Sequence, residues 1–125
     1  IVNITSAMVK NPHLIMGLST SARSGLHGLS KALSREVAQY NITINNVLPE
    51  RIDTDRQTQI LNFQAKLADS TYDEAKKELE ETLTAKRMGT VEEFSGICTF
   101  LCSEQAAYIS GQNISVDGGN STNLI

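Results

Sequence analysis

The chain has 125 residues, of which 40% are hydrophobic and 20% are charged, and its formal net charge is −3. This composition is ordinary for a globular domain and excludes a disordered or fibrous class. The eleven lysines and arginines are scattered and tryptophan is absent, so we expect no nucleic-acid partner.

The apolar runs of the chain are short. None approaches the roughly 18 residues that span a bilayer, and no basic stretch precedes the opening run 1–4 as it would in a signal peptide. We therefore expect no membrane partner and a cytoplasmic location. Cys98 and Cys102 have no further cysteine or nearby histidine to complete a metal set, so we expect two small buried hydrophobes and no metal.

The first half of the chain predicts a strand, a helix and a second strand. Residues 1–6 are β-branched and end in small polar residues, which favours a buried parallel strand, and 10–17 is a loop containing Asn-Pro and Gly. A helix is predicted over 19–40 because apolar residues recur at helical spacing: Ala22, Leu26, Leu29, Leu33 and Val37. The β-branched run 42–48 closes with Pro49 and completes a βαβ unit.

The second half predicts two further helices and a third strand. Residues 50–57 are polar and irregular, and helical patterning with a dense charge run follows over 58–85. Thr90 and Glu93 form a capping-box pattern that begins a helix through about residue 103, with an apolar face: Phe94, Ile97, Cys98, Leu101 and Cys102. A strand over 112–116 and a Gly-Gly turn end the pattern. The prediction is an α/β fold, three parallel strands with flanking helices and one open sheet edge.

Several segments are similar to the second half of a short-chain dehydrogenase/reductase. They read Ser-Gly-Leu-His-Gly-Leu-Ser-Lys-Ala-Leu-Ser-Arg-Glu over 24–36, Ile-Thr-Ile-Asn-Asn-Val over 42–47 and Val-Asp-Gly-Gly over 116–119. The likeness is greatest to 3-oxoacyl-[acyl-carrier-protein] reductases and covers essentially the whole chain. It implies that 1–125 is the C-terminal half of a single Rossmann-like, doubly wound domain, with a variable substrate lid over about 57–85.

In that family a Ser ends the fifth strand, a Tyr thirteen residues later protonates the carbonyl oxygen, and a Lys four residues further holds the ribose. The matching positions here are Ser6, Ser19 and Arg23, so the resemblance implies these three as the catalytic set. A Tyr phenol, with a reference pKa near 10, can be brought toward neutrality by an adjacent cation, whereas an aliphatic hydroxyl cannot. Arg23 keeps a permanent charge and a fork of donors, so contact with the cofactor can persist without proton transfer.

The segment from Pro49 to Thr54 matches the family's Pro-Gly-x-x-x-Thr motif beside the nicotinamide. The resemblance implies cofactor contacts from Pro49, Ile52 and Thr54, together with Arg23. Glu50 stands where the motif has Gly, and because a Glu disfavours positive φ, we expect an altered loop. These positions follow the carboxyl ends of parallel strands, where open α/β sheets bind ligands.

Two histidines offer alternatives to the missing Tyr. His13, with Lys10 nearby, lies in the loop between the first strand and the helix, and it could donate a proton if the loop folded over the site. An exposed loop histidine is the favoured interpretation of His13. We interpret His27, on the helix, as a packing or interface residue.

Two hypotheses follow from the resemblance. The first is an NAD- or NADP-dependent oxidoreductase acting on a small carbonyl, acyl or secondary-alcohol substrate, similar to 3-oxoacyl reductases. The second is a catalytically impaired family member or fragment that keeps the fold for binding or assembly, which Ser19, Arg23 and Glu50 favour. The family's glycine-rich phosphate loop would precede Ile1, outside this chain. The open sheet edge also favours a homo-oligomer, a dimer or a tetramer. The resemblance implies the same, because members of the family are usually oligomers.

Overall fold

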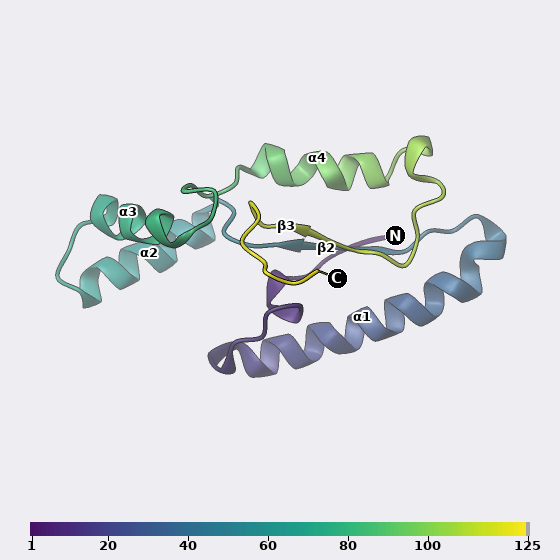
Figure 1. The fold of residues 1–125 in the computed structure, drawn as a ribbon, viewed down its shortest axis with the longest axis horizontal. Coiled ribbons are helices and arrows are strands. Elements are labelled where there is room, and N and C mark those ends of the chain that lie inside the picture. Colours follow the sequence, from purple (N-terminus) through teal and green to yellow (C-terminus); the bar gives the residue numbers. More distant parts are fainter. Residues whose placement is uncertain (125) are drawn as a thin grey trace.

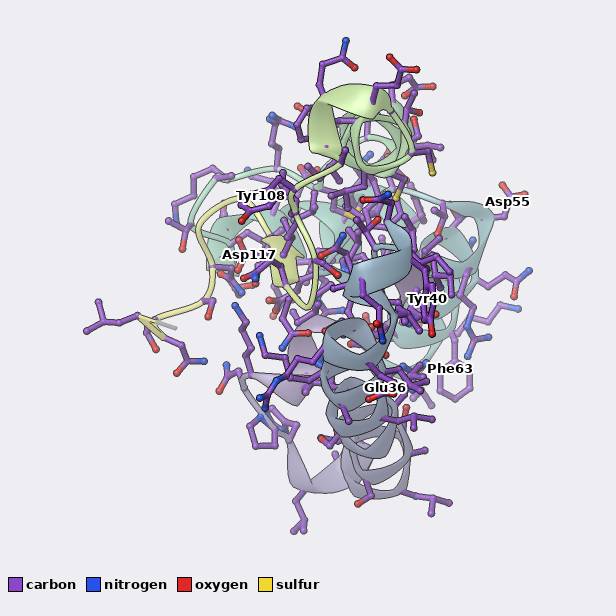
Figure 2. All side chains as sticks on the ribbon, turned by 90° about the vertical axis from the view of Figure 1, so that its right-hand side faces the viewer. Glu36, Tyr40, Asp55, Phe63, Tyr108 and Asp117 are labelled. Carbon is purple, nitrogen blue, oxygen red and sulfur yellow. The ribbon has the colours of Figure 1, made fainter. Side chains whose placement is uncertain are left out.

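The computed structural model describes residues 1–124 and shows a Rossmann-like α/β arrangement in three layers (Figure 1). The sheet consists of β1 (Val2–Ile4), β2 (Asn45–Pro49) and β3 (Asn113–Val116) in the order β1-β2-β3, all parallel. Helix α1 (Gly17–Val37) covers one face of the sheet and α4 (Val91–Leu101) covers the other, as the end-on view in Figure 2 also shows. The predicted fold class and the strand–helix–strand order are confirmed.

The first strand is shorter and more exposed than the sequence predicts. β1 ends at Ile4, whose exposed fraction is 63%, instead of continuing to Ser6 as a buried strand. The reason is that β1 lies at the end of the described strand order and pairs only with β2. After β1, Thr5 is buried, and Ser6 caps a single 3-10 turn over Ala7–Val9.

Helix α1 packs with a different face from the one that periodicity indicates. The predicted apolar stripe is open to solvent, with Leu29 57% exposed and Leu33 43% exposed. The buried positions are instead small polar residues and one histidine: Thr20, His27, Ser30 and Ser34. The apolar spacing predicts the helix but not the face that packs on the sheet, because the sheet surface beneath α1 is itself polar.

That polar surface is a ladder of asparagines across the three strands. Asn3, Asn46 and Asn113 are register partners on β1, β2 and β3. Asn3 Nδ2 donates to Asn46 Oδ1 at 3.0 Å, and Asn46 Nδ2 donates to Asn113 Oδ1 at 2.7 Å. Asn3 Nδ2 also donates to Ser30 Oγ of α1 at 3.1 Å. Small hydroxyl side chains on α1 therefore suit the sheet beneath them, because buried amides need partners.

The long charged helix predicted over 58–85 is two helices. These are α2 (Asp55–Leu67) and α3 (Tyr72–Thr82), which pack on each other at one end of the molecule (Figure 1). Asp69 has φ of 51°, and Thr71 and Glu74 form a full capping box that begins α3. The pair has its own apolar cluster around Leu61, Leu83 and Met88, separate from the main cluster around Val47, Leu101 and Ala106.

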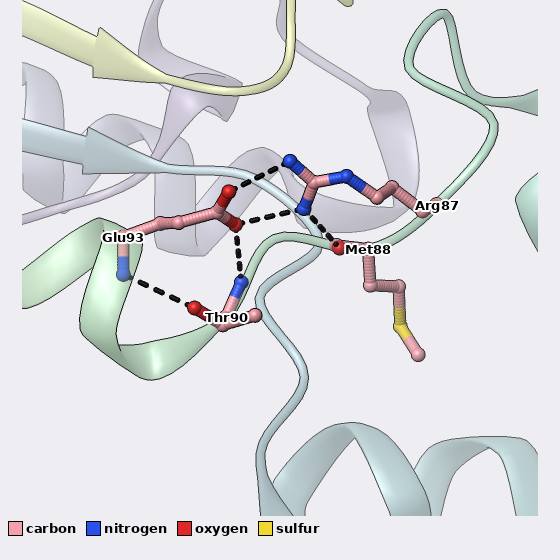
Figure 3. Close-up of polar contacts among 4 residues, drawn as sticks. All are labelled: Arg87, Met88, Thr90 and Glu93. Atoms are coloured by element: carbon pink, nitrogen blue, oxygen red, sulfur yellow. Dashed lines mark hydrogen bonds and ion pairs between the residues drawn. The ribbon is translucent and has the colours of Figure 1, made fainter.

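Helix α4 begins with the predicted capping box, which is confirmed. Thr90 Oγ1 accepts from the Glu93 amide at 3.1 Å, and Glu93 Oε2 accepts from the Thr90 amide at 2.8 Å. Arg87 adds two hydrogen bonds to the same carboxylate, at 2.8 and 2.7 Å (Figure 3). Cys98 packs against the main core, whereas Cys102 is exposed, so the expectation of two buried cysteines was half wrong. No helix in residues 1–124 combines the length and the apolar character needed to cross a bilayer.

We call the hydrogen bonds that Arg87 and Thr90 donate to the Glu93 carboxylate the Glu93 clamp. This clamp predicts that the stability of the protein depends on pH. The Arg87 guanidinium, followed by the Thr90 amide, lowers the pKa of Glu93 from 4.5 to about 2. A carboxyl group whose pKa is lower in the folded state stabilises the fold, and this stabilisation is complete above the pKa of the unfolded state. It is lost as the pH falls through the pKa of the folded state. We therefore expect Glu93→Gln to lower the melting temperature above pH 4.5, with the difference from wild type vanishing toward pH 2.

Thermal unfolding followed by circular dichroism measures this difference. Glu92→Gln, in the same first turn but outside the capping box, is the matched control and should show a smaller difference above pH 4.5. Equal pH profiles for the two variants would contradict the clamp.

Candidate active site

The carboxyl ends of the three parallel strands lie at one edge of the sheet. Ser6 follows β1, Glu50 follows β2 and Asp117 follows β3, and the register places Ile4 beside Val47 and Pro49 beside Val116. Helix α1 begins below this edge (Figure 1). The sequence-predicted residues therefore come from segments that converge on the edge where open α/β sheets bind ligands.

Ser6 is half-buried, and its hydroxyl already has one role. Its Oγ accepts from the Met8 amide at 3.2 Å, in an extended backbone conformation that starts the 3-10 turn. A serine hydroxyl that accepts one bond keeps its own proton free to donate. Ser6 can therefore still donate to an oxygen of a bound molecule.

Ser19 and Arg23 lie in the first two turns of α1, four residues apart on one face, and they contact each other. Arg23 Nη1 donates to the Ser19 carbonyl at 3.3 Å and to the Ser19 hydroxyl. Both residues are half-buried. Within residues 1–124 neither is hydrogen-bonded to Ser6, so the structure brings the Ser–Arg pair together and leaves Ser6 with a separate set of partners. A guanidinium has five N–H donors, so Arg23 keeps donors to spare.

The loop after β2 carries the other predicted residues. The residue of this loop with positive φ is Arg51, at 53°, directly after Glu50, and the altered loop expected from Glu50 stays a prediction. Ile52 forms a parallel bridge with Gly89, in which the Gly89 amide donates to Arg51 and the Asp53 amide donates to Gly89, at 3.0 and 2.8 Å. In a parallel ladder such bonds leave the amide and carbonyl of Ile52 directed to the opposite side.

Thr54 is the N-cap of α2. Its Oγ1 accepts from the Gln57 amide at 3.4 Å, so the hydroxyl proton stays free. Pro49 ends β2 in register with Val116 and is half-buried. The amide of Ile52 and the hydroxyl of Thr54 are thus two donors held by fixed structure on one short loop.

Comparison with known proteins decides the family. A family model described as "Enoyl-(Acyl carrier protein) reductase" matches residues 1–121. The chain belongs to the short-chain dehydrogenase/reductase family. It is 35% identical to the NADPH-dependent reductase BacG of Bacillus subtilis and 34% identical to the 3-oxoacyl-[acyl-carrier-protein] reductase FabG of Aquifex aeolicus. These alignments cover 96% and 95% of the chain but only 46% and 44% of the relatives, so the chain spans less than half their length.

Solved structures of short-chain dehydrogenases/reductases match the fold closely. YwfH, an NADPH-dependent reductase involved in bacilysin biosynthesis, superposes with a TM-score of 0.90 at 34% identity, over 99% of this chain and 47% of that one. An NADPH-bound short-chain oxidoreductase from Pseudomonas aeruginosa PAO1, described as containing an atypical catalytic center, gives a TM-score of 0.82 at 25% identity over 98% and 46%.

In this short-chain dehydrogenase/reductase His13 is exposed and His27 is buried, as the sequence predicts. His13 is exposed before the 3-10 turn Leu14–Met16, and its side chain makes no capping bond. His27 is buried, with Nε2 at 2.8 Å from Thr5 Oγ1, and burial, followed by the charge of Lys10, lowers its pKa. His27 is therefore a neutral packing residue near pH 7.

A pocket of about 210 Å³ lies beside the β2 loop. Glu50, Ile52, Ala85, Glu93 and Gly118 are among its lining residues, whereas Ser6, Ser19 and Arg23 are not. The pocket lies between the loops that follow β2 and β3 on one side and the segment that follows α3 on the other. In residues 1–124 no group of three or more His, Cys, Asp or Glu residues could hold a metal ion.

One residue of this edge had no signal in the sequence. Asn120 Nδ2 donates to Glu50 Oε1 at 3.0 Å, and Asn120 Oδ1 accepts from the amide and the hydroxyl of Thr84, each at 3.4 Å. Its partners lie far away along the chain, so no local pattern could reveal the contact.

Proposed function

We propose that this short-chain dehydrogenase/reductase is an NAD(P)-dependent oxidoreductase acting on a small carbonyl or secondary-alcohol substrate, of the 3-oxoacyl reductase type. Residues 1–125 would form the C-terminal half of one domain, and 57–85 would be its substrate lid. The observation that supports the proposal is the contact between Ser19 and Arg23 in α1, which begins below the carboxyl edge of the sheet. The resemblance assigns these two residues to the positions of the family's Tyr and Lys. The NADPH-dependent relatives support it, and a cytoplasmic location is part of the proposal.

The residues present suit a nicotinamide dinucleotide. Arg23 has N–H donors left for ribose hydroxyls, and the Ile52 amide and Thr54 hydroxyl are free to bond the carboxamide of the nicotinamide. The bound dinucleotide would supply hydride to the substrate carbon. Ser6 would donate a hydrogen bond to the substrate oxygen and orient it.

Proton transfer is the step that this chain handles differently. The Ser19 hydroxyl accepts from Arg23, and an aliphatic hydroxyl is a far weaker acid than the Tyr phenol it replaces. The proton would therefore come from solvent, which makes the reduction slow.

A second candidate is a family member that binds the dinucleotide and assembles without turning over substrate. The same two residues favour it, because their pairing preserves a cationic contact and removes the general acid. Dinucleotide binding is common to both candidates, and ketone reduction separates them.

Titration of the complete protein with NADPH and with NADH, followed by the fluorescence of the reduced nicotinamide, tests the shared claim. We expect Arg23→Ala to weaken binding about tenfold or more, since a charged hydrogen bond contributes about 1.5–3 kcal/mol. Arg23→Lys should bind within about threefold of wild type because the charge is kept. Arg35→Ala, in the last turn of α1, is the control. No binding by the wild type, or equal binding by Arg23→Ala, would refute the proposal.

The exposed stripe of α1 supports a homo-oligomer. Leu26, Leu29 and Leu33 share one face and are between 37% and 57% exposed, and apolar surface of this kind is commonly covered by a second subunit. We expect Leu29→Glu to shift the complete protein toward the monomer in sedimentation equilibrium, and an unchanged mass would exclude this helix from the interface.

A further inference from the structure

Asn120 joins two loops that, within residues 1–124, share one backbone bridge, between Ile52 and Gly89. Its amide nitrogen bonds Glu50, which follows β2, and its amide oxygen bonds Thr84, which follows α3. Residues 83–89 connect the proposed lid to helix α4, and we call this segment the lid root. We propose that Asn120 is a positioning residue that holds the lid root against the β2 loop, which carries Ile52 and Thr54. The effect of Asn120 on dinucleotide binding rests on the proposed function, whereas its contact between the two loops does not.

The chemistry of the three partners fixes the orientation of the Asn120 amide. The Glu50 carboxylate can only accept hydrogen bonds and the Thr84 backbone amide can only donate one. A side chain between them must donate on one arm and accept on the other. Asparagine meets this demand, whereas an aspartate would place a second carboxylate against Glu50.

The backbone around Asn120 is itself held. Asp117 accepts from the Gly119 and Ser121 amides, each at 3.0 Å, and the Asn120 amide donates to the Asp117 carbonyl at 3.1 Å. The turn also approaches the lid root closely, since a Cβ added at Gly118 would lie 3.0 Å from Ala85 Cβ. Asn120 is thus presented on a rigid turn directly beside residues 84 and 85.

The lid root is also held by the Arg87–Glu93 ion pair with α4, and α3 before it by the Lys76–Asp53 ion pair with the β2 loop. Leu83 and Met88 belong to the apolar cluster of the α2–α3 pair, and the root connects back through the Ile52–Gly89 bridge. The pocket of about 210 Å³ lies between the root and the two loops. The Glu50–Asn120–Thr84 contact therefore spans the same gap, and it sets how far the root stands from the loop that is to contact the nicotinamide.

The test reverses the polarity of the contact. In Asn120→Asp a carboxylate faces Glu50, whereas the double variant Glu50→Gln/Asn120→Asp restores a donor facing an acceptor, because the new glutamine amide donates to the new aspartate. Hydrogen–deuterium exchange of the complete protein reports on the peptides covering 83–89 and 50–54. We expect Asn120→Asp to speed their exchange about tenfold, and the double variant to return it to within about twofold of wild type.

Asn62→Asp is the matched control, since Asn62 is exposed and donates a local bond to the Thr58 carbonyl on α2, and it should leave exchange at 83–89 unchanged. Equal exchange in Asn120→Asp and wild type, or no recovery in the double variant, would overturn the inference. With NADPH present, Asn120→Asp should raise the dissociation constant about fivefold and the double variant should restore it. If the wild type binds no dinucleotide, the proposed function fails while the exchange result still decides the role of Asn120.

Discussion

Ser19→Tyr combined with Arg23→Lys should raise NADPH-dependent ketone reduction by the complete protein about 100-fold or more. A positioned general acid contributes roughly 10²–10⁴-fold to a rate, and Ser19 supplies none. The two substitutions are needed together because a phenol becomes acidic enough only beside a suitable cation. Replacing Arg23 also removes the hydrogen bonds that now hold the hydroxyl at position 19.

Steady-state oxidation of NADPH with a 3-oxoacyl thioester or a simple ketone measures the gain. Ser19→Ala is the control and should lower the wild-type rate less than about threefold, because an aliphatic hydroxyl contributes little as an acid. A double variant no faster than wild type would show that the reactive centre is organised around other residues.

Asn46→Ala should lower the free energy of unfolding by about 3 kcal/mol. Asn46 is 2% exposed, its Oδ1 accepts from Asn3 and its Nδ2 donates to Asn113. Truncation removes both bonds, leaves the half-buried amide of Asn3 with one partner fewer, and opens a small cavity. An unsatisfied buried polar group costs about 1–3 kcal/mol, and the cavity adds to that.

Urea unfolding of the complete protein measures this loss. Asn113→Ala is the matched control, since Asn113 is exposed and makes one bond to the same ladder, and it should cost about 1 kcal/mol. Equal losses for the two variants would contradict a ladder centred on β2.

Periodicity predicted which segments are helices and strands, but not which face of α1 is buried. Apolar spacing locates a helix because core contacts usually recur at that spacing. The face that packs depends on the opposing surface, which here carries Asn3 and Asn46 and selects Ser30 instead of Leu29. The break between α2 and α3 was readable in principle, because Thr71 and Glu74 form the same capping pattern that Thr90 and Glu93 display.

The residues of the candidate site also differ in how far the sequence reveals them. Ser6, Ser19 and Arg23 stay predictions that the family resemblance implies, whereas the contact between Ser19 and Arg23 follows from their spacing of four residues on α1. The link from Glu50 through Asn120 to Thr84 could not be found, because it joins three loops and depends on where tertiary packing places them. The positive φ of Arg51 beside Glu50 could not be predicted either, because arginine has no local preference for that conformation.

The central claim is that Arg23 faces the nicotinamide end of a dinucleotide at the carboxyl edge of the sheet. A crystal structure of the complete protein with bound NADP measures this directly. We predict a guanidinium nitrogen of Arg23 within about 3 Å of a ribose hydroxyl, and the Ile52 amide at the same distance from the nicotinamide carboxamide. A nicotinamide ribose bound elsewhere, with Arg23 still bonded only to Ser19, would contradict it.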